Sequence, residues 1–357
     1  MNDPVSLADF ESRAESRLAR DVWDFIAGGS GSESTLAANR SALDAVSLLP
    51  RVLAGTGTAE TSCQLLKSEA SLPVAIAPMA YQRLVHPDGE LAMAAAARDA
   101  GIPFVAPTLS SVAIEEIARV GASTWFQLYW LRERPHVDRL VGRAEEAGCQ
   151  VLMVTVDVPM LGRRLRDMRN EFRLPADVLA ANLTGGSASV AHAPVRGGSA
   201  VAAHTEELFA PALGWADLDW LRERTSLPLV VKGILDPRDA VRAVEAGADA
   251  VVVSNHGGRQ LDGAAPSVAA LPGVVAAVGA RCEVLLDSGI RSGTDVLRAL
   301  ALGASGVLAG RPLLWGLAVD GAHGAGQVLG LLLAELRDGL TLAGCANPAA
   351  ARTLAIL

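Results

Sequence analysis

The sequence predicts a (β/α)8 barrel, an α/β fold in which eight parallel strands alternate with helices. From about residue 73 onward, short runs of branched apolar residues alternate with alanine-rich stretches, a pattern typical of a parallel sheet. There are eight such runs, the number that closes this type of barrel. Several of them follow a glycine turn that ends a helix, as in EEAGCQVLMVTV and VEAGADAVVVSN. The expected strands span residues 73–77, 102–105, 124–128, 151–156, 229–232, 250–253, 284–287 and 306–309.

The runs are apolar throughout, which suits strands covered on both faces, although a buried helix segment has the same appearance. Residues before about 73 are expected to form a short N-terminal helical extension. In it, Ser6 and Asp9 are placed as a helix cap, and the glycines of AGGSGS interrupt the helices. A C-terminal helix near Gln327 to Leu340 is expected to close the barrel.

The stretch from about 175 to 211 is too polar and too rich in glycine for a barrel element, since it contains TGGSASVAHAPVRGGSA. We expect a long, mobile loop after the fourth strand. Long loops of this kind are often lids over sites, and an insertion without a function is the alternative. Residues 1–357 are therefore expected to form one domain, with the barrel at about 73–345.

Bulk composition excludes several classes of protein. A length of 357 residues is compatible with two average domains or with one barrel. Half of the residues are hydrophobic and 20% are charged, which supplies a large core and argues against a disordered chain. A net charge of -8 disfavours the capture of polyanions, so no nucleic-acid partner is expected.

The cysteines and the N-terminus point to the cytoplasm. The cysteines have no CxxC spacing, so we expect small apolar residues in place of disulfides or metal ligands, and no metal site; they are Cys63, Cys149, Cys282 and Cys345. The first twenty residues carry acids where a signal peptide has an apolar run, and no stretch offers about 18 uninterrupted apolar residues. We expect neither secretion nor a membrane.

Polar residues end or follow most of the expected strands, which is where barrel enzymes place their reactive groups. These residues are Gln127, Tyr129, Thr155, Asp157, Lys232, Ser254, His256, Asp287, Gly310 and Arg311. In VVVSNHGGRQLDG, an apolar strand runs directly into His256. Imidazole accepts protons near neutral pH, and Gly257 and Gly258 permit a close approach of backbone to a ligand. The alternative is a structural histidine that caps the strand.

A second segment, VTVDVPMLGRRLRDMRN, follows the fourth strand with a run of arginines. Such a run is usually a solvated surface, but at the end of a barrel strand one guanidinium could turn inward and bind a carboxylate with two hydrogen bonds. Asp157 could then orient the imidazole of His256, and an ion pair between Asp157 and an arginine is the competing interpretation.

Two further signals indicate an anionic ligand. Lys232, in LPLVVKGIL, is costly to bury without an anionic partner, which a cofactor would supply; a Schiff-base aldolase that uses Lys232 is the alternative. The segments LLDSGIRSG and LAGRP lie in the last two loops of the barrel, where phosphates commonly bind. This signal suits a flavin or a sugar phosphate, including a binding protein without turnover, and it consists of Gly289, Arg291, Gly310 and Arg311.

Taken together, these segments resemble the FMN-dependent 2-hydroxy-acid oxidase and dehydrogenase family, which includes glycolate oxidase, lactate oxidase and mandelate dehydrogenase. The likeness spans nearly the whole chain, and SNHGGRQLD is its most specific part. The matching segments, in family order, are AGGSGSESTLAANR, IAPMAYQRLVHPDGE, TLSS, WFQLYW, TVDVPMLGRRLRDMRN, VVKGIL, SNHGGRQLDG, DSGIRSG and AGRP.

The resemblance implies a role for each of these positions. It makes His256 the base that takes a proton from an (S)-2-hydroxy acid, with Asp157 as its partner, Arg164 and Arg259 as a clamp on the substrate carboxylate, and Tyr129 as a hydrogen-bonding neighbour. It places Lys232 near N1 and the C2 carbonyl of FMN. It implies that the flavin is lined by Pro78, Met79, Ala80, Ser110, Gln127, Thr155 and Ser254. The ribityl chain and the phosphate are expected at Asp287, Gly289, Arg291, Gly310 and Arg311.

Two positions depart from the family pattern. Phe25 stands where many members have a tyrosine that holds the carboxylate, which disfavours small hydrophilic acids such as glycolate. Ser288 replaces a glycine, and the backbone there is expected to be less free. An aryl pocket is expected from Phe25, Tyr81, Met160 and Leu161.

The segments YQRLVHPDGE and VPMLGRRLRDMRN most resemble the members that oxidise 4-hydroxymandelate. The expected activity is therefore oxidation of mandelate or 4-hydroxymandelate to the 2-keto acid. A lactate or glycolate oxidase or dehydrogenase is the alternative. Ala80 and the polar loop after the fourth strand favour oxygen as the acceptor, with hydrogen peroxide as a product. The family resemblance also suggests a homotetramer.

Overall fold

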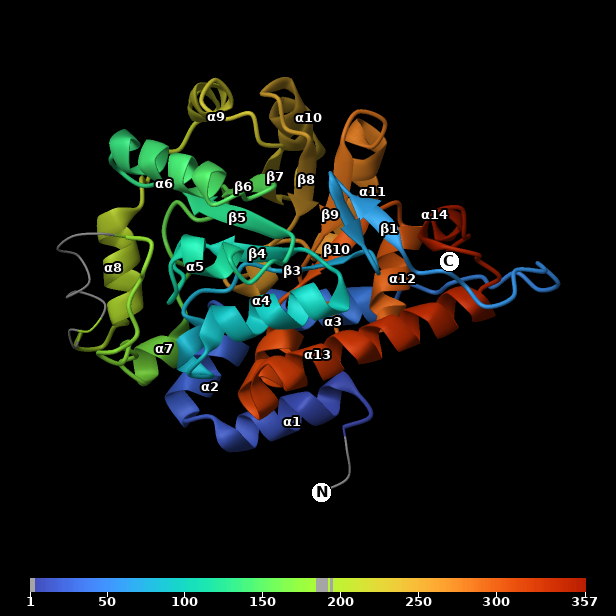
Figure 1. The fold of residues 1–357 in the computed structure, drawn as a ribbon, viewed down its shortest axis with the longest axis horizontal. Coiled ribbons are helices and arrows are strands. Elements are labelled where there is room, and N and C mark those ends of the chain that lie inside the picture. The colour runs from blue at the N-terminus through green and yellow to red at the C-terminus, as the bar shows by residue number, and fades with distance from the viewer. Residues whose placement is uncertain (1–3, 184–191, 193–194) are drawn as a thin grey trace.

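A computed structural model describes residues 4–183, 192 and 195–357. Eight parallel strands form a closed barrel in which each strand pairs with the next along the chain and the last pairs with the first. This confirms the predicted (β/α)8 fold (Figure 1). The strands are β3 (Val74–Ile76), β4 (Phe104–Pro107), β5 (Thr124–Tyr129), β6 (Val151–Thr155), β7 (Leu229–Ile234), β8 (Ala250–Val253), β9 (Glu283–Leu286) and β10 (Gly306–Ala309).

The apolar runs of the strands alternate between two cores. In β6, Val151 and Met153 point into the barrel, whereas Leu152 and Val154 pack against the surrounding helices. Successive side chains of a strand point to opposite faces, so a strand buried on both faces has to be apolar at every position. The helices that follow the strands are α4 (Gly89–Ala100), α5 (Ile114–Ala118), α6 (Arg134–Glu146), α9 (Trp215–Arg222), α10 (Pro237–Glu245), α11 (Ser267–Val278), α12 (Gly293–Ala301) and α13 (Arg311–Leu342).

A short antiparallel hairpin closes the amino end of the barrel. It consists of β1 (Cys63–Leu65) and β2 (Ser68–Ala70), which the sequence did not predict. Leu65 and Ala70 join the apolar core inside the barrel. The backbone N–H of Leu66 donates to Glu283 at the start of β9. The hairpin thus excludes water from the end of the barrel opposite the polar strand ends.

The N-terminal extension contains the expected helices, α1 (Leu7–Arg17), α2 (Arg20–Ala27) and α3 (Ser34–Asp44). The predicted cap is confirmed: the backbone N–H of Asp9 donates to Oγ of Ser6, and the backbone N–H of Ser6 donates to Oδ2 of Asp9. Helix α1 lies alongside α13 at the lower edge of Figure 1. Helix α2 reaches the pocket described below, and α3 packs against the turn that follows β8.

The predicted C-terminal helix is the second half of α13, which has non-helical angles at Asp320 and Gly321. Among the described residues, α13 is the helix with the length and apolarity of a membrane span. Its apolar side chains are buried against α1, α4 and α12, which accounts for its composition. The last helix is α14 (Pro348–Ala351).

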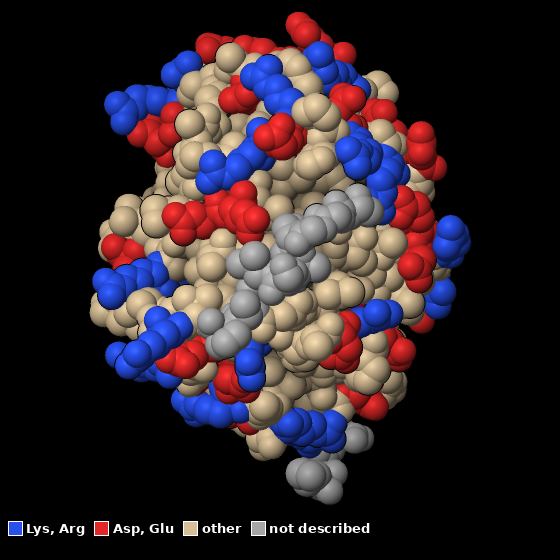
Figure 2. Space-filling view, turned by 90° about the vertical axis from the view of Figure 1, so that its left-hand side faces the viewer, with Lys and Arg blue, Asp and Glu red and all other residues tan. Residues whose placement is uncertain are grey.

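The segment after β6 differs from the expected loop. It begins with α7 (Leu165–Arg169), and α8 (Ala200–Leu208) lies within the stretch predicted to be irregular. The sequence AVAAHTEEL has strong helix formers, so the glycine-rich signal was extended too far along the chain. Residues 184–191 and 193–194 of the predicted mobile loop lie outside the described residues. On the face that carries α8, acidic and basic side chains are interspersed, with no patch of one sign (Figure 2).

Two glycines of α13 approach each other across its kink. A Cβ on Gly324 would lie 2.1 Å from the carbonyl oxygen of Gly316. We therefore expect Gly324→Ala to lower the free energy of unfolding by about 1–3 kcal/mol, because the added methyl group overpacks this contact. The measurement is the midpoint of urea unfolding.

Gly330→Ala is the matched control, because it changes the same helix at a glycine with no atom within 4 Å of the added Cβ. It should raise the free energy of unfolding by about 0.5–1 kcal/mol, since alanine is the better helix former. Equal effects of the two substitutions would contradict a specific contact at Gly324.

Candidate active site

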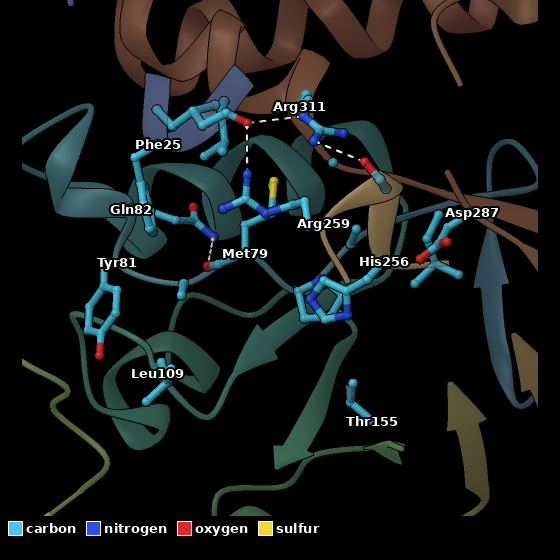
Figure 3. Close-up of a pocket in the computed structure, with 18 of the residues that line it drawn as sticks. Phe25, Met79, Tyr81, Gln82, Leu109, Thr155, His256, Arg259, Asp287 and Arg311 are labelled. Atoms are coloured by element: carbon cyan, nitrogen blue, oxygen red, sulfur yellow. Dashed lines mark hydrogen bonds between the residues drawn. The ribbon is translucent and has the colours of Figure 1, made fainter. Parts of the chain in front are cut away.

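A deep cleft lies at the carboxyl ends of the barrel strands. It encloses about 1260 Å³ of space, part of which is open to solvent. Its walls come from strand ends, from Phe25 of α2, from α8, and from the start of α13. Figure 3 shows His256, Arg259, Asp287 and Arg311 on the wall of this cleft.

The turn after β8 presents His256 to the cleft. His256 has a φ of 58°, and Gly257 and Gly258 continue with 65° and 74°. This left-handed conformation is uncommon for a residue with a side chain and is found where function requires it. A Cβ on Gly258 would lie 2.6 Å from the backbone nitrogen of Leu36 in α3. Glycine is therefore required where α3 packs against the turn.

The imidazole of His256 has a partner on each side. Its Nδ1 lies 2.9 Å from Oδ1 of Asp157, and its Nε2 lies 3.4 Å from the hydroxyl of Tyr129. The carboxylate of Asp157 fixes the proton on Nδ1, which leaves Nε2 as an acceptor toward the cleft. Burial lowers the pKa of His256 against the opposing charge of Asp157, so the ring is neutral at pH 7. His256 therefore does more than cap the strand.

Asp157 pairs with the histidine and with no arginine of the described chain, so the competing ion-pair interpretation is wrong. Burial raises the pKa of Asp157. The charge that His256 carries when protonated and the charge of Lys232 outweigh this effect, so the pKa of Asp157 is lowered. Asp157 is thus ionised and can stabilise the protonated form of the imidazole.

Of the arginine run, only Arg164 turns into the cleft. Its pKa is lowered by burial, and its nearest carboxylate, Asp167, is 4.0 Å away. Its Nε atom has no hydrogen-bond partner among the described residues. Arg166 instead pairs with Asp24 and Glu33 between α2 and α3, while Arg163 and Arg169 are exposed.

Arg259 and Arg164 both lie close to the ring of Phe25. The two guanidinium carbons are 5.4 Å and 5.9 Å from the ring centroid, respectively. Nη1 of Arg259 donates to the carbonyl oxygen of Gly28 at 2.8 Å. Its pKa is lowered well below the ordinary value by burial and by the nearby charges of Arg164 and Arg311. Two neighbouring guanidiniums with so little negative charge nearby form a site for a carboxylate.

Lys232 is 4% exposed, and its ammonium group is bound by two protein side chains. Its Nζ lies 2.9 Å from Oδ2 of Asp287 and donates to Oγ of Ser254 at 3.0 Å. Burial favours the neutral amine, but Asp287 and Asp157 outweigh it and raise the pKa of Lys232. A lysine nucleophile needs a lowered pKa, so this environment argues against the aldolase alternative.

The far end of the cleft is also cationic. Arg291 and Arg311 have pKa values lowered by burial to about 10 and about 9, and no carboxylate of the described residues lies within ion-pair distance of either. Arg311 donates to the carbonyl oxygens of Ile26, Gly28 and Gly257, and Figure 3 marks hydrogen bonds that leave its guanidinium group. Helix α13 begins at Arg311 without a side-chain cap. Pro312 has no N–H and the N–H of Leu313 donates to the carbonyl oxygen of Gly310, so the N–H of Arg311 is the one among these three residues that can serve an anion.

This arrangement fits FMN. A phosphate would be held by Arg291, Arg311, Gly289 and the first turn of α13. Lys232 lines the same cleft and would supply the positive charge that the resemblance implies beside the pyrimidine edge of the flavin. The unpaired guanidiniums are the observation that decides the fit, because their burial is costly until an anion is bound.

Most predicted site residues line the cleft. The exceptions among the flavin positions stand one layer behind it: Gln127 donates to Oγ1 of Thr155 at 3.0 Å, Ser254 accepts from Lys232, and Ser110 is fully buried. The residues in the wall itself are Phe25, Pro78, Met79, Ala80, Tyr81, Tyr129, Thr155, Leu161, Arg164, Lys232, His256, Arg259, Asp287, Gly289, Arg291, Gly310 and Arg311.

Met160 was placed in the aryl pocket wrongly. Its side chain is 68% exposed, and it is absent from the cleft wall. Its carbonyl oxygen accepts from Gln260. This contact fixes the backbone so that the next residue, Leu161, faces the cleft instead.

The contribution of α8 to the cleft was not predicted from the sequence. Val201, Thr205 and Phe209 line the cleft, and the ring of Phe209 lies 4.6 Å from that of Tyr129. These residues are spaced by four, which is the spacing of one helix face, so their periodicity could have revealed them.

The known proteins that are similar to this chain agree with the site described above. A 4-hydroxymandelate oxidase from Amycolatopsis orientalis is 56% identical over 350 residues, which cover 98% of this chain and 97% of that protein. An L-lactate oxidase from Nostoc is 47% identical and covers 97% of this chain and 96% of its own length.

A crystal structure of mandelate oxidase with (S)-4-hydroxymandelic acid is 55% identical, has a TM-score of 0.97 and covers 99% of each chain. The model of the FMN-dependent dehydrogenase family matches residues 14–356. With the cationic cleft at the carboxyl end of its barrel, the chain therefore belongs to the FMN-dependent dehydrogenase family.

Proposed function

We propose that this enzyme oxidises an aryl 2-hydroxy acid, mandelate or 4-hydroxymandelate, to the 2-keto acid, with oxygen as the acceptor and hydrogen peroxide as the second product. The observation that carries the proposal is the convergence of His256, Arg164 and Arg259 on one cleft beside the ring of Phe25. A base, a carboxylate clamp and an aromatic surface are the three features that such an acid requires.

The two arginines bind and orient the acid. Arg164 and Arg259 both provide donors to the carboxylate, and burial strengthens these charge-assisted hydrogen bonds. This contact holds the hydroxyl-bearing carbon near Nε2 of His256. The hydroxyl of Tyr129, 3.4 Å from the same nitrogen, is placed to bond the substrate oxygen.

His256 is placed to take a proton from the substrate at Nε2, and FMN, when bound, would supply the acceptor for the two electrons of the oxidation. Asp157 stabilises the positive charge that develops on the ring. Lys232 keeps its own positive charge at the cleft through its pair with Asp287. The enclosing walls exclude water from these charges, which strengthens each interaction.

Apolar and aromatic side chains favour an aryl substituent on the acid. Phe25 stacks on Phe172 with ring centroids 4.5 Å apart, so it is held rigidly. Leu161, Tyr81 and Phe209 complete an apolar wall. The relative from Amycolatopsis orientalis is named for 4-hydroxymandelate, which supports the same substrate here.

The choice of oxygen and a homotetrameric assembly rest on family resemblance. The relatives cited above are named as oxidases, which supports oxygen as the electron acceptor.

The proposal is tested with the purified yellow protein and a panel of lactate, glycolate, mandelate and 4-hydroxymandelate, with peroxide as the readout. We expect the aryl acids to give the highest kcat/KM. In His256→Ala, the protein should stay yellow and turnover should fall by about 10²–10⁴-fold, since the base is lost. No peroxide from any acid would refute the oxidase function, and near-normal turnover of the variant would refute the base.

The pH dependence of kcat/KM reports the protonation of His256. The base acts only when neutral, so kcat/KM should rise as pH increases through the lowered pKa of His256 and then level off. Asp157→Asn removes the charge that raises this pKa. The rise should therefore move to lower pH, and the plateau should fall because the ring is a weaker base. A rise that moves to higher pH would contradict the assignment.

The carboxylate clamp is tested by Arg259→Met, which keeps much of the apolar stem. We expect KM to rise about 10- to 100-fold, because a hydrogen bond between charged groups contributes about 1.5–3 kcal/mol. Arg163→Met is the matched control, because Arg163 is exposed in the same run as Arg164. The clamp assignment fails if the two variants have the same KM.

A further inference from the structure

The serine at position 288 occupies a backbone conformation that suits glycine. Its φ is 75°, in the left-handed region, and it follows β9 next to Asp287. A side chain is strained in this region, and such strain persists where the surroundings hold it in place. Ser288 is buried at 7% exposure, and it lines the cleft.

The hydroxyl of Ser288 joins two parts of the site. It donates to Oδ1 of Asp287 at 2.7 Å and accepts from the backbone N–H of Gly257 at 2.9 Å. The other oxygen of Asp287 binds Lys232 at 2.9 Å. A continuous path of hydrogen bonds thus runs from Lys232 through Asp287 and Ser288 to the residue that follows His256.

A second path of hydrogen bonds leads from Lys232 to the backbone N–H of His256 itself. Lys232 donates to Oγ of Ser254, which accepts from the backbone N–H of His256 at 3.1 Å. Both peptide N–H groups around the histidine are therefore held by hydroxyl oxygens that connect to one lysine. Because His256 itself has a left-handed φ of 58°, its turn needs such support to keep one conformation.

We propose that Ser288 is a positioning residue that ties the turn of His256 to the Lys232–Asp287 ion pair and so fixes the base relative to the cationic side chain. This inference rests on the proposed function, because it assigns the base role to His256. Ser288 acts through Gly257 and Asp287. The path through Ser254 remains when Ser288 is changed, so the effect is partial.

The test uses Ser288→Gly in the FMN-loaded enzyme. Glycine relieves the backbone strain while it removes the hydroxyl, so a merely structural role predicts a variant at least as active as the wild type. We expect kcat for the aryl acid to fall about 10- to 100-fold, because small displacements of a reacting group have effects of this size. KM should change little, since Arg164 and Arg259 do not contact Ser288.

Two further measurements do not depend on turnover. Hydrogen exchange of the peptide that contains Gly257 should be faster in Ser288→Gly, because its N–H loses an acceptor. The reduction potential of bound FMN should become more negative. Without the hydrogen bond from Ser288, the carboxylate of Asp287 compensates more of the positive charge of Lys232. The net positive charge beside the flavin is then smaller.

Leu53→Gly is the matched control, because Leu53 has a φ of 56° and is fully exposed. It relieves the same kind of backbone strain at the surface, and kcat, exchange at Gly257 and the potential should stay at wild-type values. Ser288→Ala, which keeps the Cβ atom, should match Ser288→Gly in kcat and in exchange.

The proposal is overturned if Ser288→Gly keeps wild-type kcat, or if exchange at Gly257 is unchanged. A wild-type enzyme that oxidises no 2-hydroxy acid would instead refute the proposed function, while exchange and potential would still report whether Ser288 links the two groups.

Discussion

The structure depends on an excess of positive charge buried at the carboxyl end of the barrel. Arg164, Arg259, Arg291, Arg311 and Lys232 all line the cleft, and Asp287 is the one carboxylate among its wall residues. Desolvation of unpaired cations is unfavourable, which is why burial lowers the pKa of the four arginines. A bound phosphate and a bound carboxylate would supply the negative charge that compensates these buried cations. The site therefore binds its two anions with cationic groups that have few carboxylate partners of their own.

The cationic groups are held by segments that are far apart in the sequence. The carbonyl oxygens of Ile26 and Gly28, at the end of α2, accept from both Arg259 and Arg311. The N-terminal extension thus completes the site, in addition to covering the barrel. Its glycine break is needed for this contact, because the carbonyl groups at the end of a helix have no partner within the helix and can serve as acceptors.

Much of the fold follows from local sequence patterns. The strands could be predicted because parallel strands buried on both faces are apolar at every position, and their ends were correct to within about two residues. The hairpin β1–β2 was missed because Cys63–Leu65 and Ser68–Ala70 are too short for a periodic pattern. Helix α8 was not predicted because the glycine-rich segment next to its alanine-rich sequence favoured an irregular loop. Met160 was misplaced because the direction of a side chain in a loop depends on tertiary contacts, here that of its carbonyl with Gln260.

The residues that could be predicted in the site are those with a fixed chemical role at a strand end, such as His256 and Lys232. Part of the apolar wall comes from α8, where Val201, Thr205 and Phe209 lie on one face of the helix and its end. Helix α8 thus contributes to the wall of the cleft but supplies none of its charged groups. Evolution can then alter the range of acids that a relative accepts by substitutions in this helix, while the barrel and its reactive groups are left intact.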